Sequence, residues 1–401
     1  MQLKKSILPL ALLLGLAGCF DDSSTGGSSA VAPEPAILST ASRFQAWADT
    51  AKLSMPDDSN LATASWKDRW DSVVNFDKYQ SQARANIKAI AADWASRHSQ
   101  LSEWKEVYTV TSPLIPTYGT LRLVSFAVDG VSQGGFVWIP KSAQNGSVPV
   151  VLFGHPDDQG IDLFYMYALL SQLMDSTIAS RVAIVAPAYR GEIASAGTAS
   201  VASDISAASP WDRDVDDALA MLNGALSNYS RQLDASRICA VGYSRGAGVS
   251  LLASLRDARI QSVFEIAGPA DFFAPSIQRL SMSLLAGHTA DLPGLNALNS
   301  QLLQPFGKRT ISADSLRHAL LQRSAARLAL SGLLPTSTAV HGNADTTVYP
   351  DQSIALHKAS ARVTYLPIAG MTHSSFFSDM TQISQVQTAL QGFLRTQLNL
   401  P

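Results

Sequence analysis

The sequence contains few cysteines and few charged residues: two of its 401 residues are cysteine, and 15% are charged. Two cysteines cannot build a disulfide framework, and Cys19 and Cys239 have separate explanations. The 30 basic and 32 acidic side chains nearly balance and form neither a basic stripe nor an acidic tail. An electrostatic interface for nucleic acid is therefore excluded as the main function, and we expect no nucleic-acid partner.

The sequence also lacks the motifs that hold metals and phosphates. It contains no His/Cys spacing typical of zinc, no Asp-x-Asp-x-Asp-Gly calcium loop and no glycine-rich loop followed by lysine. Four aspartates do lie close together, at Asp212, Asp214, Asp216 and Asp217. They stand at an expected helix start, where carboxylates offset the helix dipole. We therefore interpret them as helix N-terminal acids, and we expect neither a metal nor a cofactor.

Long apolar runs are missing except near the N-terminus, where the run from Ile7 to Leu16 is too short to span a bilayer. Two lysines precede this run, and it ends in Leu-Ala-Gly-Cys19, which resembles a bacterial lipobox. The alternative is an ordinary secretory signal with an accidental cysteine. We expect residues 1–18 to be a removed signal peptide and Cys19 to carry lipid. The chain would then belong to the cell envelope, anchored to a membrane through lipid alone, outside the cytoplasm.

Changes of composition divide the rest of the chain. Residues 19–37 are rich in serine and glycine and end in prolines, which is typical of a flexible tether. Residues 38–103 carry four tryptophans and other apolar residues at helical spacings, with few strand formers. We expect these residues to form a helical appendage packed on the main domain, residues 104–401. A substrate-facing aromatic platform is the alternative.

The main domain alternates strand and helix patterns. Apolar and β-branched runs predict strands at 104–111, 120–128, 135–140, 148–153 and 182–186. Later strands at 238–241, 263–267, 338–340 and 362–368 alternate with helical patterns, one of them near 212–226. This rhythm predicts an α/β fold with a doubly wound, mostly parallel sheet and sites at the carboxyl ends of the strands. An apolar insert at about 272–329 is expected to form a helical cap over the site.

The strongest motif is Gly-x-Ser-x-Gly around Ser244. An apolar run leads into Gly242-Tyr243-Ser244-Arg245-Gly246, and a small-residue helix pattern follows it. A serine nucleophile needs such a strained strand-to-helix turn, and the glycines admit neighbouring backbone where a side chain would clash. The N-terminus of the following helix favours a developing oxyanion. The motif alone could arise by chance, but its strand-before, helix-after setting predicts a nucleophile.

A nucleophilic serine needs a base and an acid that orients the base. In this architecture the chain order is serine, acid, histidine, and each partner follows a strand. Asp345 and His373 satisfy both conditions, so we predict a catalytic triad of Ser244, Asp345 and His373. Asp271 and Asp351 are the rival acids. Of these, Asp271 follows the strand next after the nucleophile, where some hydrolases keep their acid.

Other histidines fit the triad less well. His288 and His318 fall in the cap region, and His357 falls inside a helix, where a surface role is expected. His341 stands at a strand end but before the acid. We expect its ring to pack and hydrogen-bond inside that loop.

The expected oxyanion hole combines the backbone N–H of Arg245 with one from the loop after the strand at 148–153. Asp157 is the better second donor, because the proline before it has no N–H. The carboxylate of Asp157 should then point outward or pair with a cation, and Arg190 is the candidate partner. His155, Tyr243 and Arg190 are the residues we expect near the substrate, with His155 bracing the loop.

These motifs together resemble the α/β-hydrolase superfamily, and within it the catalytic domain of the prolyl-oligopeptidase-like group. The likeness covers roughly residues 120–390 and rests on the segments 124–130, 188–192, 214–219, 241–248 and 341–348, with His373 to follow. The resemblance implies that Ser244 is the nucleophile, Asp345 the acid and His373 the base. The chain departs from the pattern at 154–157, where Gly-His-Pro-Asp replaces His-Gly-Gly or His-Gly-x. It also has no room for the β-propeller of the family peptidases.

Three functions remain open at this point. The first is a serine esterase that cleaves a carboxylic ester through an acyl-enzyme. The second is an oligopeptidase of prolyl-oligopeptidase type that uses the same triad on short peptides. The third is a catalytically silent surface lipoprotein that binds a ligand or partner. The missing propeller favours the esterase, and an intact triad argues against the silent protein.

Overall fold

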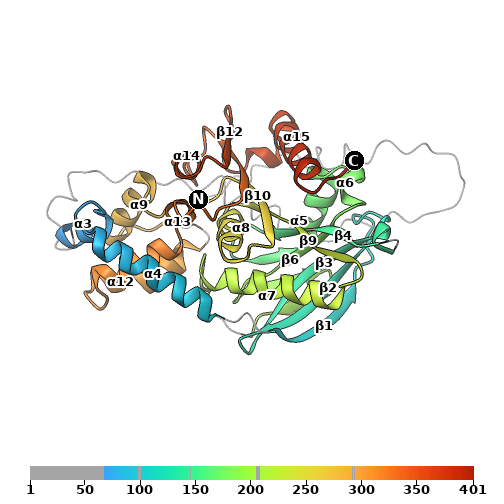
Figure 1. Ribbon diagram of the computed structural model, residues 1–401, viewed down its shortest axis with the longest axis horizontal. Coiled ribbons are helices and arrows are strands. Elements are labelled where there is room, and N and C mark those ends of the chain that lie inside the picture. Colours follow the sequence, from blue (N-terminus) through green and yellow to red (C-terminus); the bar gives the residue numbers. More distant parts are fainter. Residues whose placement is uncertain (1–66, 98–100, 145, 205–207, 291, 293) are drawn as a thin grey trace, which may run out of the picture. The chain divides into compact units, whose positions relative to one another are not determined.

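The computed structural model describes residues 67–97, 101–144, 146–204, 208–290, 292 and 294–401, all within the compact unit Pro35–Pro401 (Figure 1). The expected signal peptide, Cys19, the tether and the start of the appendage lie outside the described residues. Those expectations therefore stay predictions. Among the helices described, none combines the length and the apolar character needed to cross a membrane.

A nine-stranded sheet organises the described residues, in the order β1-β2-β3-β6-β4-β9-β10-β11-β12. Its first strands are antiparallel: β1 (Leu101–Thr109), β2 (Gly119–Val128), β3 (Val131–Pro140) and β6 (Ala183–Pro187). The others run parallel to β6 and to one another: β4 (Val148–Gly154), β9 (Leu233–Tyr243), β10 (Ile260–Ile266), β11 (Thr336–Gly342) and β12 (Val363–Ile368). The predicted mostly parallel sheet is confirmed, and β1 begins three residues before the expected boundary at 104.

Each face of the sheet carries its own hydrophobic core. Alternate side chains of β4 point to opposite faces, so that Val150 and Leu152 join one buried cluster while Val151 and Phe153 join the other. All seven residues of β4 are buried, which explains why its sequence reads as one continuous apolar run. A chain that buries both faces of a sheet needs helices on both sides, as the α/β rhythm predicts.

The helices that cover the sheet follow the predicted alternation. Those that complete the main domain are α5 (Leu163–Tyr167), α6 (Ser176–Ala179), α7 (Arg213–Asn228), α8 (Arg245–Arg256), α14 (Asp351–Ala359) and α15 (Met380–Gln397). Short irregular turns lie at η2 (Lys141–Gln144), η3 (Ala168–Leu173) and η5 (Ser375–Phe377). A second, three-stranded sheet was not expected from the sequence: β5 (Gly160–Asp162), β7 (Ile193–Ala196) and β8 (Ala199–Ala202).

The segment between β10 and β11 is helical. It contains α9 (Pro275–Leu285), α10 (Leu295–Leu298), η4 (Asn299–Leu303), α11 (Gln304–Gly307), α12 (Ala313–Gln322) and α13 (Ala325–Ala329). Two helices from the N-terminal region, α3 (Lys67–Val74) and α4 (Gln80–Ser96), lie beside α12 (Figure 1). Trp70 of α3 contacts Phe306 edge-to-face at 6.2 Å, and Arg69 donates to the Phe306 carbonyl at 2.9 Å. The N-terminal helices therefore pack on the insert.

Candidate active site

Ser244 occupies the sharp turn between β9 and α8. Its φ of 53° and ψ of −124° are strained for a residue with a side chain, and its N–H donates to the carbonyl of Ile266 at 2.9 Å. The flanking glycines are required by contact distances. A Cβ on Gly242 would lie 2.3 Å from the Gly246 carbonyl oxygen, and one on Gly246 would lie 2.1 Å from that of Gly154. Gly242 and Gly246 must therefore be glycine, because the backbones of β4, β9 and α8 are in direct contact there.

The structure brings Ser244, His373 and Asp345 together. The Ser244 Oγ lies 2.9 Å from Nε2 of His373, and the His373 Nδ1 lies 2.7 Å from Oδ2 of Asp345. Asp345 follows β11 and His373 follows β12, so neighbouring parallel strands deliver both side chains to the edge of the sheet where β9 ends. All three residues are buried. A serine in this arrangement can pass its proton to the imidazole.

The carboxylate of Asp345 is held in one orientation. Its Oδ1 accepts from the backbone N–H groups of Thr347 at 2.9 Å and Val348 at 3.0 Å, which leaves Oδ2 for His373. Burial raises the pKa of this carboxyl, but the nearby histidines His373 and His341 outweigh burial, so the pKa lies well below its usual value. Asp345 is therefore ionised, as an acid that orients a base must be.

Behind Asp345 lies a buried hydrogen-bond chain that runs to Glu265. The His341 ring contacts the Val348 carbonyl through Nε2 at 2.8 Å and the Ser353 hydroxyl through Nδ1 at 2.7 Å. Ser353 in turn donates to Glu265 at 2.6 Å. His341 thus hydrogen-bonds inside its loop, as expected, but the sequence did not predict the link to Glu265. The one signal was an acid inside the apolar run of β10.

His341 also lies close to the acid itself, with its Nε2 3.5 Å from Oδ2 of Asp345. Burial lowers the pKa of His341, but Asp345 and Glu265 outweigh burial and raise it above its usual value. The Asp345 carboxylate that orients His373 therefore also interacts with the imidazole of His341.

The rival acids have other partners. Asp271 forms an ion pair with Arg327 at 2.8 Å and accepts from the N–H of Phe273 at 2.9 Å. Asp351 accepts from the backbone N–H and the hydroxyl of Ser276. Of the other histidines considered, His288 and His357 are exposed, and His318 is half-buried in α12.

The two expected oxyanion donors lie at the ends of β4 and β9. Neither the backbone N–H of Arg245 nor that of Asp157 donates a hydrogen bond to another described residue. The carboxylate of Asp157 does not point outward. It is buried, accepts from the Tyr165 hydroxyl and takes the N–H of Gln159 at 2.8 Å. The predicted pairing of Asp157 with Arg190 is wrong, because Arg190 binds Asp217 at 2.6 Å.

The guanidinium of Arg245 links the turn at Ser244 to the loop after β4. It forms ion pairs with Glu192 at 2.6 Å and Asp214 at 2.9 Å, and it donates to the carbonyl of Asp157 at 2.9 Å. Asp214 is one of the four clustered aspartates. They stand at the N-terminus of α7 as expected, and in addition each binds an arginine: Asp212 to Arg97, Asp214 to Arg245, Asp216 to Arg256 and Asp217 to Arg190. The sequence did not predict these pairings.

His155 and Tyr243 are both buried. The His155 ring stacks on Tyr189 with 4.3 Å between ring centroids, and its Nδ1 lies 2.7 Å from the Pro156 carbonyl, so His155 braces the oxyanion loop as expected. Tyr243 stacks on the His373 ring at 5.2 Å and its hydroxyl donates to the His373 carbonyl. These two side chains hold the loops of the site. Their expected contact with substrate stays a prediction.

A small cavity of about 60 Å³ opens beside Ser244. Trp211, Thr347 and Val348 lie outside the insert and form part of the cavity wall. The insert between β10 and β11 supplies the rest, mainly aliphatic side chains: Ile277, Leu280, Leu292, Leu295, Leu298, Leu303 and Leu320. The insert therefore lies against the nucleophile, which is where the sequence places a cap.

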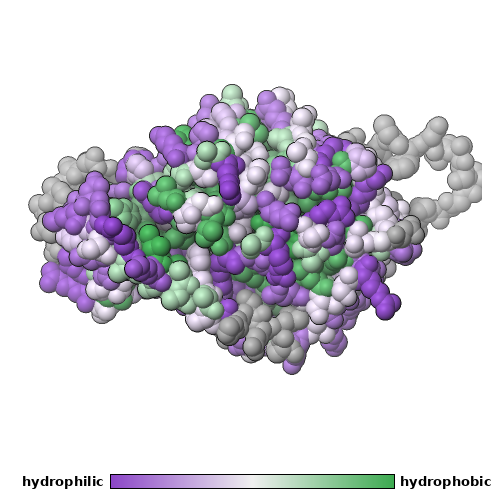
Figure 2. Space-filling model, viewed as in Figure 1, coloured by the Kyte–Doolittle hydropathy of each residue, from purple (hydrophilic) through white to green (hydrophobic). Residues whose placement is uncertain are grey.

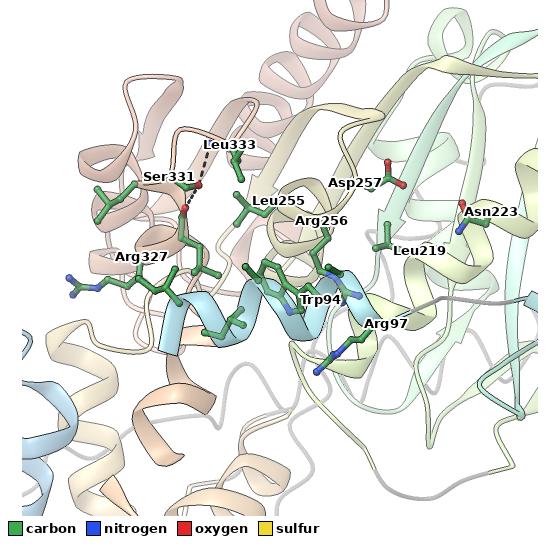
Figure 3. A pocket seen from close by; sticks show the side chains of 16 residues that line it. Trp94, Arg97, Leu219, Asn223, Leu255, Arg256, Asp257, Arg327, Ser331 and Leu333 are labelled. Carbon is green, nitrogen blue, oxygen red and sulfur yellow. Dashed lines mark hydrogen bonds between the residues drawn. The ribbon is translucent and has the colours of Figure 1, made fainter. Parts of the chain in front are cut away.

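A larger cavity of about 920 Å³ lies elsewhere, between α4, α7, α8 and the segment after α13. Figure 2 shows hydrophobic residues gathered on this face, and Ile87, Leu330 and Leu333 are exposed there. In Figure 3, Trp94 of α4 faces Arg256 of α8, whose guanidinium lies 5.5 Å from the indole centroid. None of the site residues predicted from the sequence lines this cavity, as far as the chain is described.

Comparison with solved structures finds matches to several hydrolases. An acylaminoacyl peptidase from Pyrococcus horikoshii matches with 15% identity and a TM-score of 0.50, over 70% of this chain and 42% of the peptidase. Acetyl xylan esterase 1 from Thermoanaerobacterium matches with 15% identity and a TM-score of 0.47, over 77% of this chain and 93% of that one. An S-formylglutathione hydrolase from Agrobacterium tumefaciens matches with 16% identity and a TM-score of 0.48, over 74% and 99%.

No protein-family model matches the sequence, and no curated protein matches it. The likeness is therefore one of fold. Together with the strand order and the helices on both faces, it shows that the chain has the α/β-hydrolase fold predicted from its motifs.

Proposed function

We propose that this chain is a serine hydrolase that cleaves a carboxylic ester. The observation that carries the proposal is the continuous contact from Ser244 Oγ through His373 to Asp345, at 2.9 Å and 2.7 Å. Function has to be argued from the site, because this fold serves many activities. The apolar cavity beside Ser244 supports an ester with an apolar part over a charged substrate.

The geometry supports a two-step reaction. Ser244 Oγ bonds to the ester carbon while its proton passes to Nε2 of His373, and the carbonyl oxygen becomes an oxyanion near the N–H groups of Arg245 and Asp157. The ester C–O bond then breaks, and the same proton leaves with the alcohol. Water repeats the sequence on the acyl-enzyme, with His373 as base, and releases the acid. Asp345 stabilises the imidazolium in both steps.

A serine oligopeptidase of prolyl-oligopeptidase type is the second candidate. Its support is the likeness of fold to the Pyrococcus peptidase, of which the match spans 42%. An oligopeptidase of this type needs either a group that binds the peptide amino terminus or a pocket of the size of proline. Among the described residues around the cavity beside Ser244 there is no carboxylate that could bind an amino terminus, which favours the esterase.

The test compares matched esters and aminoacyl amides on purified wild-type protein and Ser244→Ala. We expect the wild type to hydrolyse simple esters and the variant to lose this activity by several orders of magnitude, with an unchanged circular dichroism spectrum. Turnover of amides without turnover of esters would replace the esterase with the oligopeptidase. Turnover of neither would leave the silent binding protein, and equal turnover by the variant would exclude Ser244 as the nucleophile.

We also propose that the enzyme works in the cell envelope. The support is the sequence Leu-Ala-Gly-Cys19 after a short apolar run. Attached acyl chains would hold the protein on a membrane surface, while the rest of the chain folds around the sheet outside the cytoplasm. An anchored esterase would meet esters that come from the surroundings of the cell.

A further inference from the structure

The cavity beside Ser244 points to the size and chemistry of the substrate. We infer that it holds one uncharged, slim, apolar arm of the ester, about four to six non-hydrogen atoms long, and that Trp211 and Leu280 set the limit. The inference rests on the proposed esterase, since it assigns the part of the substrate that lies next to the attacked carbonyl.

The length follows from the volume. The cavity measures about 60 Å³, and a water-sized group needs about 10–15 Å³ on a comparable scale. The space therefore takes roughly four to six such groups. A bulky ring system or a long acyl chain would have to displace the surrounding side chains, which are buried and closely packed.

The chemistry follows from the lining. Of the described residues around the cavity, Arg245 is the only charged one, and its guanidinium is bound by Glu192 and Asp214. It is therefore not free to pair with a charged arm. The hydroxyl groups of Ser281 and Thr347 are the other polar side chains besides Ser244. An arm that enters this space leaves water for apolar surface, which favours hydrocarbon over polar or ionised groups.

Trp211 forms a wall that is fixed from several sides. Its indole N–H donates to the Arg245 carbonyl at 3.1 Å, its ring meets Phe272 at 5.1 Å, and its backbone has a φ of 55°. The Trp211 ring also packs directly against Gly248 of α8, because a Cβ on Gly248 would lie 2.7 Å from the ring. Asp157 and Ser244 also have positive φ, so three non-glycine residues at this site have a strained backbone.

The opposite wall is made of cap side chains, and α9 offers a matched pair of them. Leu280 and Leu284 are one helical turn apart and both buried, at 8% and 6% exposure. Leu280 lines the cavity, whereas Leu284 packs in the core without reaching it. Truncation of either removes the same group from the same helix, but only truncation of Leu280 enlarges the cavity.

The first experiment measures kcat/KM for two ester series. One varies the acyl chain of p-nitrophenyl esters from acetate to dodecanoate, and the other varies the alcohol of alkyl acetates from ethyl to octyl. In the series whose arm enters the cavity, we expect kcat/KM to rise about four-fold per methylene up to roughly four to six carbons and to fall beyond that. The other series should show no such maximum, which identifies the arm.

The second experiment repeats the series with Leu280→Ala and, as control, Leu284→Ala. Leu280→Ala should move the maximum to longer chains, and Leu284→Ala should leave its position unchanged. Leu280→Phe fills the space, so it should move the maximum towards acetate. This variant keeps the inference testable if Leu280→Ala does not fold. A flat profile in an active enzyme, a preference for dodecanoate or equal shifts in both alanine variants would overturn the inference. Absence of any ester turnover would overturn the proposed function itself.

Discussion

At the scale of single residues, the acid of the triad is the assignment that can be tested most cleanly. Asp345 binds His373 at 2.7 Å, whereas the rival Asp271 binds Arg327 at 2.8 Å. We expect Asp345→Asn to lower kcat by about 10³–10⁴-fold, because the amide favours the wrong tautomer of His373. Asp271→Asn should keep kcat within about ten-fold of the wild type. Steady-state kinetics on one ester measures both, and equal losses would make the assignment of the acid wrong.

His341 gives a prediction about stability and pH. Its pKa in the folded protein is raised above the ordinary value by Asp345 and Glu265, which outweigh burial. A raised pKa means that the stabilisation is complete below the unfolded-state pKa, about 6.5, and is lost as pH rises through the folded-state pKa. His341→Gln should therefore cost more unfolding free energy at about pH 6 than at about pH 9.

Urea unfolding of wild type and His341→Gln at both pH values checks this. His357→Gln is the control, because that side chain is exposed and its ring contacts the Val363 carbonyl and the Tyr365 ring but no carboxylate among the described residues. A destabilisation by His341→Gln that is equal at both pH values, or larger at high pH, would contradict a protonated His341 beside Asp345.

What the sequence reveals at this scale depends on whether the strand ends of the sheet place the partner, and not on how many residues separate the two. Ser244, Asp345 and His373 could be placed because strand ends converge on one edge of a parallel sheet. The inward turn of Asp157 could not, since it depends on the Tyr165 hydroxyl in a neighbouring helix. Glu265 was missed for the same reason, because its partner Ser353 lies inside helix α14 and does not follow the end of a strand.

At the scale of elements, the close contact of β4, β9 and α8 gives a prediction about glycine. A Cβ on Gly246 would lie 2.1 Å from the Gly154 carbonyl oxygen, whereas nothing lies within 4 Å of one on Gly392. Gly246→Ala should destabilise the protein by several kcal/mol, about 3 or more, or prevent folding. Gly392→Ala, in the exposed part of α15, should stabilise it by about 0.5–1 kcal/mol. Chemical denaturation compares the two, and similar effects would contradict the backbone contact.

The elements themselves divide by how strongly the sequence marks them. β4 is one apolar run and was expected at 148–153, within one residue of its observed end, whereas β9 was expected at 238–241 and already begins at Leu233. The sheet of β5, β7 and β8 was not expected, because strands of three or four residues are too short to show a period. The four clustered aspartates at the start of α7 were expected to interact only with the helix dipole. Their arginine partners come from distant segments, Arg97 among them, which no local pattern reveals.

At the scale of the whole molecule, the N-terminal sequence predicts where the protein resides. Residues 1–66 lie outside the described part of the chain, so the prediction rests on the sequence. In a bacterial host, the wild type should fractionate with membranes and incorporate labelled fatty acid, and Cys19→Ser should do neither. Cys239→Ser serves as control, since Cys239 is a buried thiol in β9. Membrane association that survives Cys19→Ser would contradict lipid anchoring at Cys19.

The central claim is that the hydroxyl of Ser244 is a nucleophile activated by His373. Its most direct test is labelling with a fluorophosphonate, followed by mass spectrometry of the intact protein and of its peptides. We predict one adduct per wild-type chain, on the peptide that contains Ser244, and no adduct on Ser244→Ala. Labelling should also slow markedly in His373→Ala, because the base is lost. An unlabelled wild type, or an adduct that persists in Ser244→Ala, would contradict the account.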